Sequence, residues 1–484
     1  MTEYEAVIGL EVHAELLTES KMFCGCRVVD SVEAPPNSAV CPICLGMPGM
    51  LPVINRQAVD FALRVALALN CEIQAENVFA RKNYFYPDLP KGYQISQYER
   101  PLARHGWLDI TLPDGSQRRI GIRRVHMEED TGKLTHLNGE GSLVDYNRSG
   151  VPLLEIVSEP DLRSAEEVYA YALRLRQILR YLQVNSGDLE KGVLRVEPNI
   201  SLREASSSEF GTRTEVKNLN SFRALAAATA YELKRQEAIL RGGGKVAQET
   251  RGWNEGRRET FPQRTKEEAD DYRYFPEPDL PPLFVDEEWI EHVRRKLPEL
   301  PHVKAARYMA DFGLSAYDAA VLTEDRPVAE WFEAAVAAGG EPKTIANWLI
   351  NNLFALINES QQEIEAIRMT PEGLVALVRL VDEGAISHNT AKDVLVEMFN
   401  SGKAPQTIVD EKGLAQISSR EALEIVVNKV LDENADQVRA YVQGKEQLSG
   451  WFVGQVMRET RGKANPQLTN ELVADLLERR RGAL

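Results

Sequence analysis

The stretch MTEYEAVIGLEVHAEL (1–16) decides how the fold begins, because its residues alternate between two faces. One face carries Ala6, Ile8, Leu10, Val12 and Ala14, and the opposite face carries Glu11 and His13. A period of two predicts a β-strand with one buried face. The segment has no basic start and no separate apolar core, so we expect a strand that begins at once and not a signal peptide.

The rest of the N-terminal half alternates between short segments with strand patterns and helices. Pro, Gly and Asn separate segments such as 195–203 and 212–220, which we predict to be strands. Apolar spacing predicts helices over 56–70, 164–183 and 221–241. The second of these begins with the capping-box pattern of Ser164 and Glu167.

The chain changes character near residues 276–300, a segment rich in Pro, and becomes helical in pattern beyond it. A loop predicted at 402–413 precedes a tail. We therefore predict an α+β protein: an N-terminal cradle on a twisted, mostly antiparallel sheet with flanking helices, then an all-α half. The expected domains are 1–292, 293–405 and 406–484.

The whole chain has 484 residues and a formal net charge of −16, with 43% hydrophobic and 27% charged residues. Its length predicts two to four domains, and its composition is typical of globular proteins. It has no run of 18 or more apolar residues, so we expect no membrane span and a cytoplasmic location. The acidic balance argues mildly against a large nucleic-acid-binding surface but allows a local one.

The five cysteines are too few and odd in number for a disulfide framework. Four of them form CxC and, 14 residues later, CxxC: Cys24, Cys26, Cys41 and Cys44. Thiolates spaced in this way can reach one metal from two tight turns and complete a tetrahedral zinc site. Four ordinary buried thiols are the alternative, but the clustering favours structural zinc. Cys71, which ends an apolar helix, is expected to be a packed thiol.

Acidic residues interrupt three apolar strand patterns. They are Glu11, beside His13, in VIGLEVHAEL (7–16), Glu129 in RVHMEEDTGK (124–133) and Glu155 in GVPLLEIVSEPD (150–161). A buried carboxylate must be paired, protonated or bound to a metal. A single Glu of this kind would best be explained as a side chain that points to solvent or pairs with an Arg. Three strands with the same anomaly favour a functional site. Several carboxylates with a His suit a hard divalent cation, and Mg²⁺ if the substrate is a phosphate.

The alternation also separates two adjacent acids. Glu128 shares a strand face with His126, whereas Glu129 shares one with Val125 and Met127.

Basic and aromatic residues gather in matching places. They include Arg81, Lys82 and Asn83 before Tyr84–Pro87, Arg148 in DYNRSGVP (145–152), and Arg213 and Lys217 in GTRTEVKN (211–218). Such side chains could hold phosphates or a carboxylate, or could form ordinary surface salt bridges. The chain has neither a GxxxxGK[ST] phosphate loop nor a GxSxG elbow.

The longest motifs of the chain resemble one known family, the B subunits of the heterotrimeric glutamyl/aspartyl-tRNA amidotransferases. The motifs are VIGLEVHAEL (7–16), ARKNYFYPDLPKGYQISQY (80–98), IRRVHMEEDTGK (122–133), LVDYNRSGVPLLEIVSEPD (143–161), LRVEPNISLR (194–203), EVKNLNSF (215–222), QETRGW (248–253) and DDYRYFPEPDLPPL (270–283). They are nearly gapless and spread through the first 290 residues. The tail motif WFVGQVMRETRGKANP (451–466) is similar too, though less tightly.

The resemblance implies a kinase and transamidase. ATP would phosphorylate the side-chain carboxylate of Glu-tRNA(Gln) or Asp-tRNA(Asn), and ammonia would then displace phosphate to give Gln-tRNA(Gln) or Asn-tRNA(Asn). The ammonia would come from a separate glutaminase subunit (A), and a small belt subunit (C) would complete the heterotrimer. The further partners implied are the tRNA and the non-discriminating aminoacyl-tRNA synthetase.

The resemblance also assigns roles to residues. Mg²⁺ would be held by Glu11, His13, Glu129 and Glu155, the same residues that the buried-carboxylate argument selects. Lys82 and Arg148 would neutralise phosphate oxygens, and ATP would contact these two together with Tyr84 and Lys217. The four cysteines match the zinc-bearing branch of the family.

The tail would contact the tRNA body, again by resemblance. It carries 11 Lys and Arg against 12 Asp and Glu, with local basic patches at Arg458, Arg461, Lys463 and 479–481. Two other functions compete with the transamidase. One is a non-catalytic tRNA-binding scaffold, and the other is a zinc-containing, ATP-dependent ligase of a free small acid.

Overall fold

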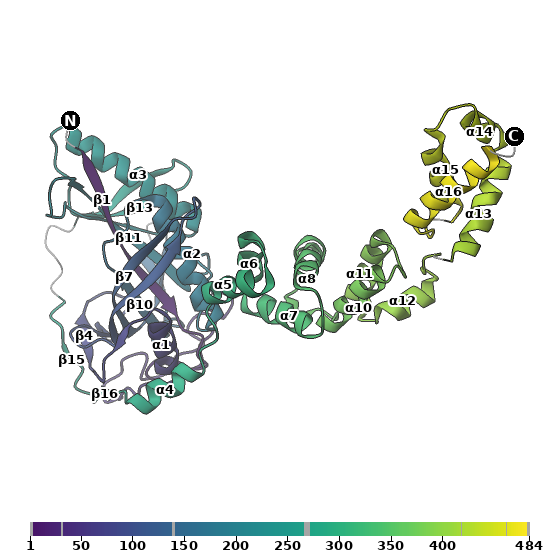
Figure 1. Cartoon of the computed structure of the whole chain (residues 1–484). Helices are drawn as coiled ribbons and strands as arrows, with labels where there is room; N and C mark the ends of the chain where they lie inside the picture. Colours follow the sequence, from purple (N-terminus) through teal and green to yellow (C-terminus); the bar gives the residue numbers. More distant parts are fainter. Residues whose placement is uncertain are drawn as a thin grey trace. The chain divides into compact units, whose positions relative to one another are not determined.

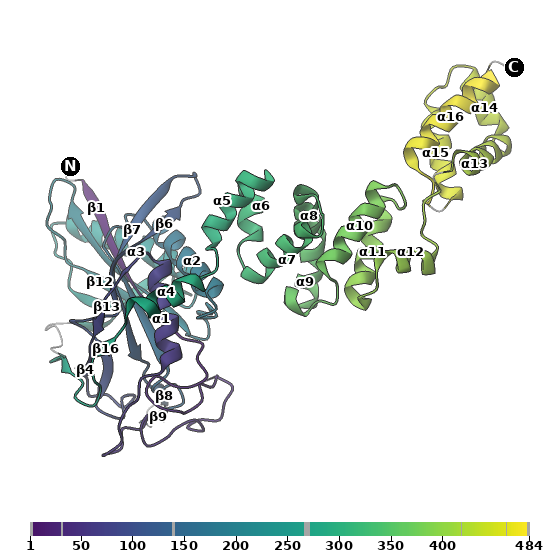
Figure 2. The same ribbon diagram turned by 60° about the horizontal axis from the view of Figure 1, so that its bottom comes forward.

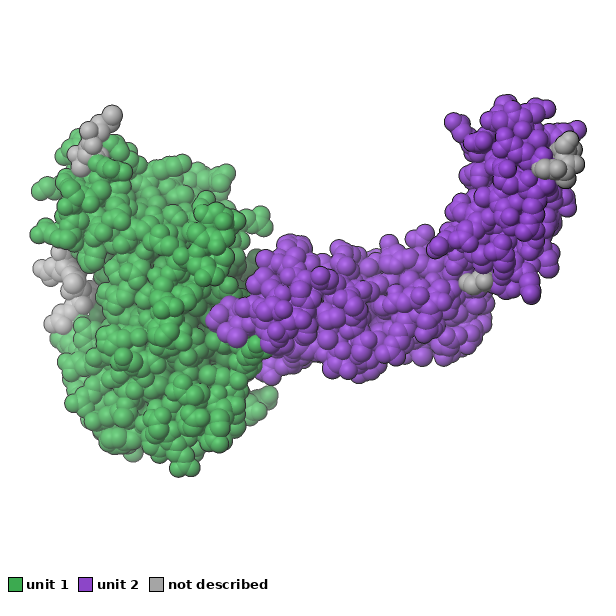
Figure 3. All heavy atoms as spheres, viewed as in Figure 1, with its two compact units in different colours: residues 1–301 green, residues 302–484 purple. Residues whose placement is uncertain are grey.

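The computed structural model describes residues 3–30, 32–137, 141–265, 272–417, 419–460 and 462–481. The chain forms two compact units, residues 1–301 and 302–484 (Figure 3). The first unit is rich in strands with flanking helices and the second is helical, which confirms the predicted α+β class. The domain boundaries at 292 and 405 stay predictions.

A nine-stranded sheet forms the centre of the first unit (Figure 1). Its strands, in sheet order, are β14 (Glu259–Thr265), β13 (Glu249–Asn254), β12 (Thr214–Lys217), β11 (Leu194–Glu204), β1 (Tyr4–Glu15), β10 (Pro152–Ser158), β7 (Gln117–Glu129), β6 (Ala103–Thr111) and β2 (Glu72–Ile73). Neighbouring strands are antiparallel except β12 and β13, which are parallel. The opening stretch therefore forms the middle strand, between β10 and β11.

Three helices cover one face of this sheet (Figure 1; Figure 2). They are α1 (Arg56–Ala68), α2 (Ala165–Tyr181) and α3 (Phe222–Arg241). The apolar face of β1 packs against them, and Ile8, Leu10 and Val12 are at most 1% exposed. Ser164 caps α2 by accepting a hydrogen bond from the amide of Glu167, as predicted. Such a cap stabilises a helix by about 1 kcal/mol.

Smaller sheets border the large one. β4 (Phe79–Asn83) pairs with β5 (Tyr93–Gln97) and with β15 (Phe275–Pro276), so segments far apart in the sequence lie side by side. β3 (Glu76–Asn77) pairs with β16 (Leu283–Phe284), and β8 (Lys133–Leu137) pairs with β9 (Gly141–Asp145). Helix α4 (Glu287–Arg295) packs on α1, and its Trp289 Nε1 donates to Asp60 over 2.6 Å.

The second unit contains two hydrophobic clusters. The first is formed by α5 (Pro301–Phe312), α6 (Ala316–Leu322), α7 (Arg326–Ala337), α8 (Pro342–Trp348), the π-helical turn Leu349–Leu353, α9 (Phe354–Ser360), the 3₁₀ turn Ile364–Ala366, α10 (Pro371–Asp382), α11 (His388–Ser401) and α12 (Pro405–Lys412). The second is formed by α13 (Arg420–Glu433), α14 (Ala435–Val442), α15 (Leu448–Glu459) and α16 (Pro466–Arg481).

The loop predicted at 402–413 is wrong, because it contains α12. Pro405 stands at the first helical position, where a missing N–H costs nothing, and Gly413 ends the helix in the left-handed conformation. No described helix is long and apolar enough to cross a bilayer.

Candidate functional site

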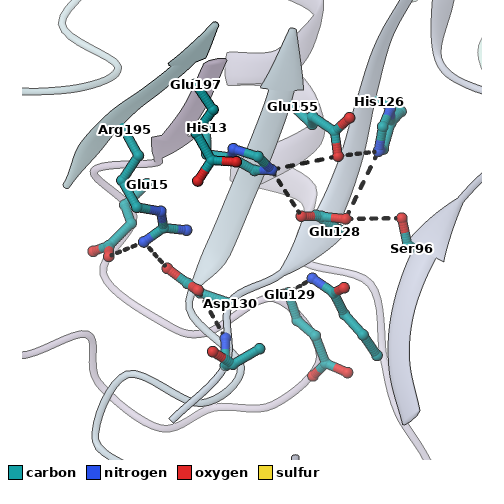
Figure 4. A network of polar contacts seen from close by, with 12 residues as sticks. His13, Glu15, Ser96, His126, Glu128, Glu129, Asp130, Glu155, Arg195 and Glu197 are labelled. Carbon is teal, nitrogen blue, oxygen red and sulfur yellow. Dashed lines mark hydrogen bonds and ion pairs between the residues drawn. The ribbon is translucent and has the colours of Figure 1, made fainter. Parts of the chain in front are cut away.

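Three neighbouring strands, β1, β10 and β7, carry polar side chains that lie together on one face of the sheet (Figure 4). His13 of β1 lies across from Glu155 of β10, and Glu155 lies across from His126 of β7. Glu128 follows on the same face of β7, since residues two apart in a strand share a face. Sheet order therefore gathers two imidazoles and two carboxylates from three distant segments.

The side chains of this group, which we call the His–Glu group (His13, His126, Glu128 and Glu155), are in mutual contact. His13 Nε2 lies 3.5 Å from Glu155 Oε2 and 4.0 Å from Glu128 Oε1. His126 Nε2 lies 3.2 Å from Glu155 Oε2 and 3.7 Å from Glu128 Oε2. Ser96 Oγ donates to Glu128 Oε2 over 2.9 Å, which fixes that carboxylate from β5.

Burial and charge shift the pKa values of these groups in opposite directions. Burial alone would lower the pKa of His126, but the carboxylates of Glu155 and Glu128 raise it to about 9. Burial would raise the pKa of Glu155, but His126 and His13 hold it well below its usual range. Two carboxylates therefore stay ionised in a buried place, where opposite charges must balance them.

The His–Glu group fits a divalent cation. One ligand atom each from His13, Glu128 and Glu155 lie within 4.8 Å of one another. His13 Nδ1 and His126 Nδ1 are buried and have no hydrogen-bond partner within the described part of the chain. One nitrogen and two carboxylate oxygens suit Mg²⁺ or a similar ion that keeps some of its waters.

Glu11 belongs to a second acidic group on the same face. Its carboxylate oxygen, with one each from Glu197 and Glu215, lies within the same 4.8 Å limit. Lys217 Nζ lies 2.8 Å from Glu197 Oε2 and 3.2 Å from Glu215 Oε1, so it neutralises much of this charge. Burial and the charge of Glu155 raise the pKa of Glu11.

The predicted quartet of Glu11, His13, Glu129 and Glu155 is not assembled as one group. His13 and Glu155 come together, Glu11 joins the second acidic group, and Glu129 turns to the other face of β7 (Figure 4). There its carboxylate lies 2.8 Å from Lys91 Nζ and accepts from the amide of Ile95 over 2.9 Å. Glu128 lies beside His13 and Glu155, where Glu129 was expected, because adjacent residues of a strand point in opposite directions.

Of the two predicted phosphate ligands, Lys82 lies near the His–Glu group, whereas Arg148 binds backbone carbonyl oxygens. Lys82 Nζ lies 5.0 Å from the centre of the Tyr272 ring, and Tyr84 is part of the same aromatic surroundings. Burial would lower the pKa of Lys82, but Glu128 and other neighbouring acidic groups raise it. Arg148 instead donates to the carbonyl oxygens of Thr131 and Gly132, each over 3.0 Å. The structure therefore brings Lys82 to the His–Glu group but uses Arg148 to hold a loop.

A cavity of about 720 Å³ lies beside Glu11 of the second acidic group. Its lining includes Glu11 and Asn199, the backbone around Gly9 and Ser158, and a rim of Arg123, Arg124, Phe210 and Arg213. Arg124 Nη2 lies 3.8 Å from Glu155 Oε1, which connects the rim to the His–Glu group. Sequence reasoning missed Arg123, Arg124, Asn199 and Phe210; the tandem arginines two residues before His126 were the available signal.

The four clustered cysteines lie together as a candidate metal site. Sulfur atoms of Cys24, Cys26, Cys41 and Cys44 all lie within 4.8 Å of one another, and none is in a disulfide. A hydrogen bond from Cys24 is the main cause that lowers the pKa of Cys44 to about 4. Four such sulfurs are the donor set that tetrahedral zinc prefers.

Lys21, which sequence reasoning missed, adds a second observation at the cysteines. It is fully buried, and its Nζ donates to Cys44 Sγ over 3.7 Å and to the Tyr146 carbonyl over 3.2 Å. A buried ammonium needs an anionic neighbour, which a thiolate supplies. Cys71 is separate and buried, as predicted, and burial raises its pKa to about 12.

Comparisons with known proteins identify the family of this chain. A family described as "GatB/GatE catalytic domain" matches residues 6–291, and one described as "GatB domain" matches residues 330–477. The chain is 56% identical over 478 residues to the B subunit of the aspartyl/glutamyl-tRNA(Asn/Gln) amidotransferase of Moorella thermoacetica, covering 98% of this chain and 100% of the relative. It is 52% identical over 477 residues to the protein of the same name from Thermoanaerobacter sp. (strain X514), covering 99% and 100%. The chain therefore belongs to the family of B subunits of the tRNA-dependent amidotransferases.

Proposed function

We propose that this chain carries out ATP-dependent transamidation of Glu-tRNA(Gln), Asp-tRNA(Asn) or both. The observation that carries the proposal is the His–Glu group, which Arg124 connects to a cavity of about 720 Å³ lined by further arginines. This volume suits a nucleotide-sized ligand. Arginine forks suit phosphate oxygens.

The reaction needs two balanced steps. A side-chain carboxylate oxygen attacks the γ-phosphorus of ATP, so the bond to ADP breaks and an acyl phosphate forms. Ammonia then attacks the acyl carbon, the C–O bond breaks, and the products are the amide and hydrogen phosphate. Phosphoryl transfer depends mainly on positioning and charge neutralisation, which this site offers.

We assign roles by position. His13, Glu128 and Glu155 would hold Mg²⁺, which supplies positive charge to the transferring phosphoryl group when bound. His126 and Ser96 orient the two carboxylates through the contacts given above. Arg124 and Lys82, both close to the His–Glu group, would neutralise phosphate or substrate carboxylate oxygens. Lys217 balances the acidic pair Glu197 and Glu215 and is not proposed as a phosphate ligand.

The four cysteines would hold zinc with a structural role, because all four positions of a tetrahedral site are filled by sulfur. We further propose a glutaminase subunit as ammonia source, a small belt subunit, and the aminoacyl-tRNA synthetase as partners. The name of the relatives supports this, because it describes one subunit of an amidotransferase.

The tail, residues 406–484, would contact the tRNA body. Its three terminal arginines are ion-paired with acids: Arg479 with Asp475, Arg480 with Asp432, and Arg481 with Glu478. Arg461 lies outside the described residues. Such a surface suits recognition of the shape of the folded RNA better than it suits phosphate binding by unpaired cations.

The test is a reconstitution with the partner subunits, misacylated tRNA, ATP, Mg²⁺ and ammonium, following labelled Glu or Asp on the tRNA. Conversion that needs ATP and is lost in Glu128→Gln supports the proposal. Binding of the tRNA without any conversion supports the scaffold function instead. Amidation of the free amino acid without tRNA supports the small-acid ligase.

A further inference from the structure

A row of tyrosines borders the His–Glu group, and only one of them, Tyr84, has been given a role above, as an expected contact of ATP. Its members come from three separate segments, one after β4, one after β5 and one before β15. In order of ring contact they are Tyr98, Tyr274, Tyr272, Tyr84 and Tyr86. We call this set the tyrosine row.

The rings of the tyrosine row are in continuous contact. Tyr98 and Tyr274 are stacked, with centres 4.2 Å apart and planes 8° from parallel. Tyr272 meets Tyr274 edge to face at 6.1 Å, and it meets Tyr84 in the same manner at 6.3 Å. Tyr84 stacks on Tyr86 at 5.7 Å. Stacked and edge contacts of this kind hold each ring in a defined orientation.

These rings are not part of the hydrophobic core of the first unit. Tyr98 and Tyr86 are each 45% exposed, at the two ends of the row. A groove of about 370 Å³ lies against Tyr98 and Tyr274, and its walls contain apolar residues such as Phe275 and Pro276 together with the charged Glu76, Glu99 and Arg100. Ordinary surface packing would explain a single pair of rings, but it does not explain five rings in series beside a groove.

Cations accompany the row and connect it to the His–Glu group. Lys82 Nζ lies 5.0 Å from the centre of the Tyr272 ring, and the Arg124 guanidinium lies 5.8 Å from that of Tyr98. Arg124 also reaches Glu155 over 3.8 Å. One end of the row is therefore one side chain away from the carboxylates at which substrate chemistry is proposed.

We propose that the tyrosine row binds the unpaired 3′-terminal nucleotides of the aminoacylated tRNA. Unpaired bases stack on aromatic side chains, and neighbouring cations accompany the phosphates. A 3′ end bound along the row would deliver its aminoacyl group beside Glu155. The inference rests on the proposed function, because it assumes an aminoacylated RNA as substrate.

The adenine ring of ATP has the same stacking chemistry and is the competing ligand. One adenine needs only one or two neighbouring stacking partners, whereas the row has exposed rings at both of its ends, Tyr98 and Tyr86. The arginine-rimmed cavity of about 720 Å³ already offers space for a nucleotide. The observations therefore favour several successive bases, as in the single-stranded end of a tRNA.

The test uses the complete complex and measures binding without turnover. The dissociation constants of the intact tRNA and of the same tRNA lacking its unpaired 3′ nucleotides give a preference ratio. We expect Tyr98→Leu and Tyr274→Leu to reduce this ratio about 5- to 100-fold, the range for losing one stacked base. Phe284→Leu, an exposed aromatic residue outside the row, is the matched control and should leave the ratio unchanged.

Three results would overturn the inference. The first is an unchanged ratio in folded Tyr98→Leu and Tyr274→Leu complexes, which makes the row ordinary packing. The second is a raised KM for ATP with an unchanged ratio, which assigns the row to adenine. The third is an absence of preference in the unsubstituted complex, even if transamidation is intact. Recovery of the ratio in Tyr98→Trp, which restores an aromatic face, would exclude misfolding as the cause.

Discussion

Glu128 and Glu129 provide the sharpest test of the site, because they are adjacent in sequence and point to opposite faces of β7. In Glu128→Gln the His–Glu group keeps its shape but loses one of its two anionic ligands. In Glu129→Gln the His–Glu group is untouched, and the contact with Lys91 is lost instead. The two substitutions are chemically identical, so any difference between them comes from position.

The expected magnitudes also differ. Loss of a residue that merely supports a metal ligand typically weakens metal binding about 10- to 100-fold, so loss of the ligand itself should cost about 100-fold or more. Glu129 and Lys91 are buried partners, with side chains 3% and 10% exposed. Breaking such a pair should lower the free energy of unfolding by about 3 kcal/mol. Glu128→Gln should therefore change metal affinity, and Glu129→Gln should change stability.

The assay is Mn²⁺ binding to the full chain, followed by electron paramagnetic resonance, with denaturant unfolding of the same samples. Mn²⁺ is chosen because it accepts the same oxygen and nitrogen donors as Mg²⁺. Equal loss of Mn²⁺ affinity in both variants, or loss in Glu129→Gln alone, would refute the assignment of Glu128. The readout needs neither tRNA nor partner subunits.

His126, the cysteine cluster and the terminal arginines can each be tested separately. The pKa of His126 is raised to about 9, so its contribution to stability is complete below the unfolded value of 6.5 and is lost as pH rises through 9. In EDTA the free energy of unfolding should therefore fall between about pH 7 and 9, and His126→Gln should remove that part of the slope in denaturant titrations. Zinc measured by mass spectrometry should be absent from Cys44→Ser. Lys21→Met should weaken zinc retention about 10- to 100-fold in competition with a chelator. If Lys21→Met retains zinc as well as the unsubstituted chain, the buried ammonium is not a partner of the site. Replacing Arg479, Arg480 and Arg481 with Ala should leave the salt dependence of tRNA binding unchanged, because all three are ion-paired, whereas lost phosphate contacts would make the slope shallower.

Much of the first unit could be predicted from local pattern. The alternation in 1–16 predicted a strand with Glu11 and His13 on its polar face, and the capping pattern predicted the start of α2 at Ser164. The CxC and CxxC spacing predicted that Cys24, Cys26, Cys41 and Cys44 lie together, as they do in the structure. These features depend on residues close together in the chain, so backbone periodicity alone determines them.

The choice between Glu128 and Glu129 was also present in the sequence. Glu128 shares a strand face with His126, and the structure brings both side chains to Glu155, across from His13. The family pattern and the buried-carboxylate argument both led to Glu129 instead. Alternation says which residues share a face but not which face meets which neighbour, so the sequence alone left the assignment open.

The tertiary structure decided which polar faces meet. The sheet order β12-β11-β1-β10-β7 places His13 beside Glu155 and Glu11 beside Glu197, and β15 brings the segment of Tyr274 to that of Lys82. Local pattern determined neither these neighbours nor the burial of Lys21 at the cysteines. Strand pairing between distant segments is set by the total burial of the sheet and its helices, a property of the whole first unit that no local stretch contains.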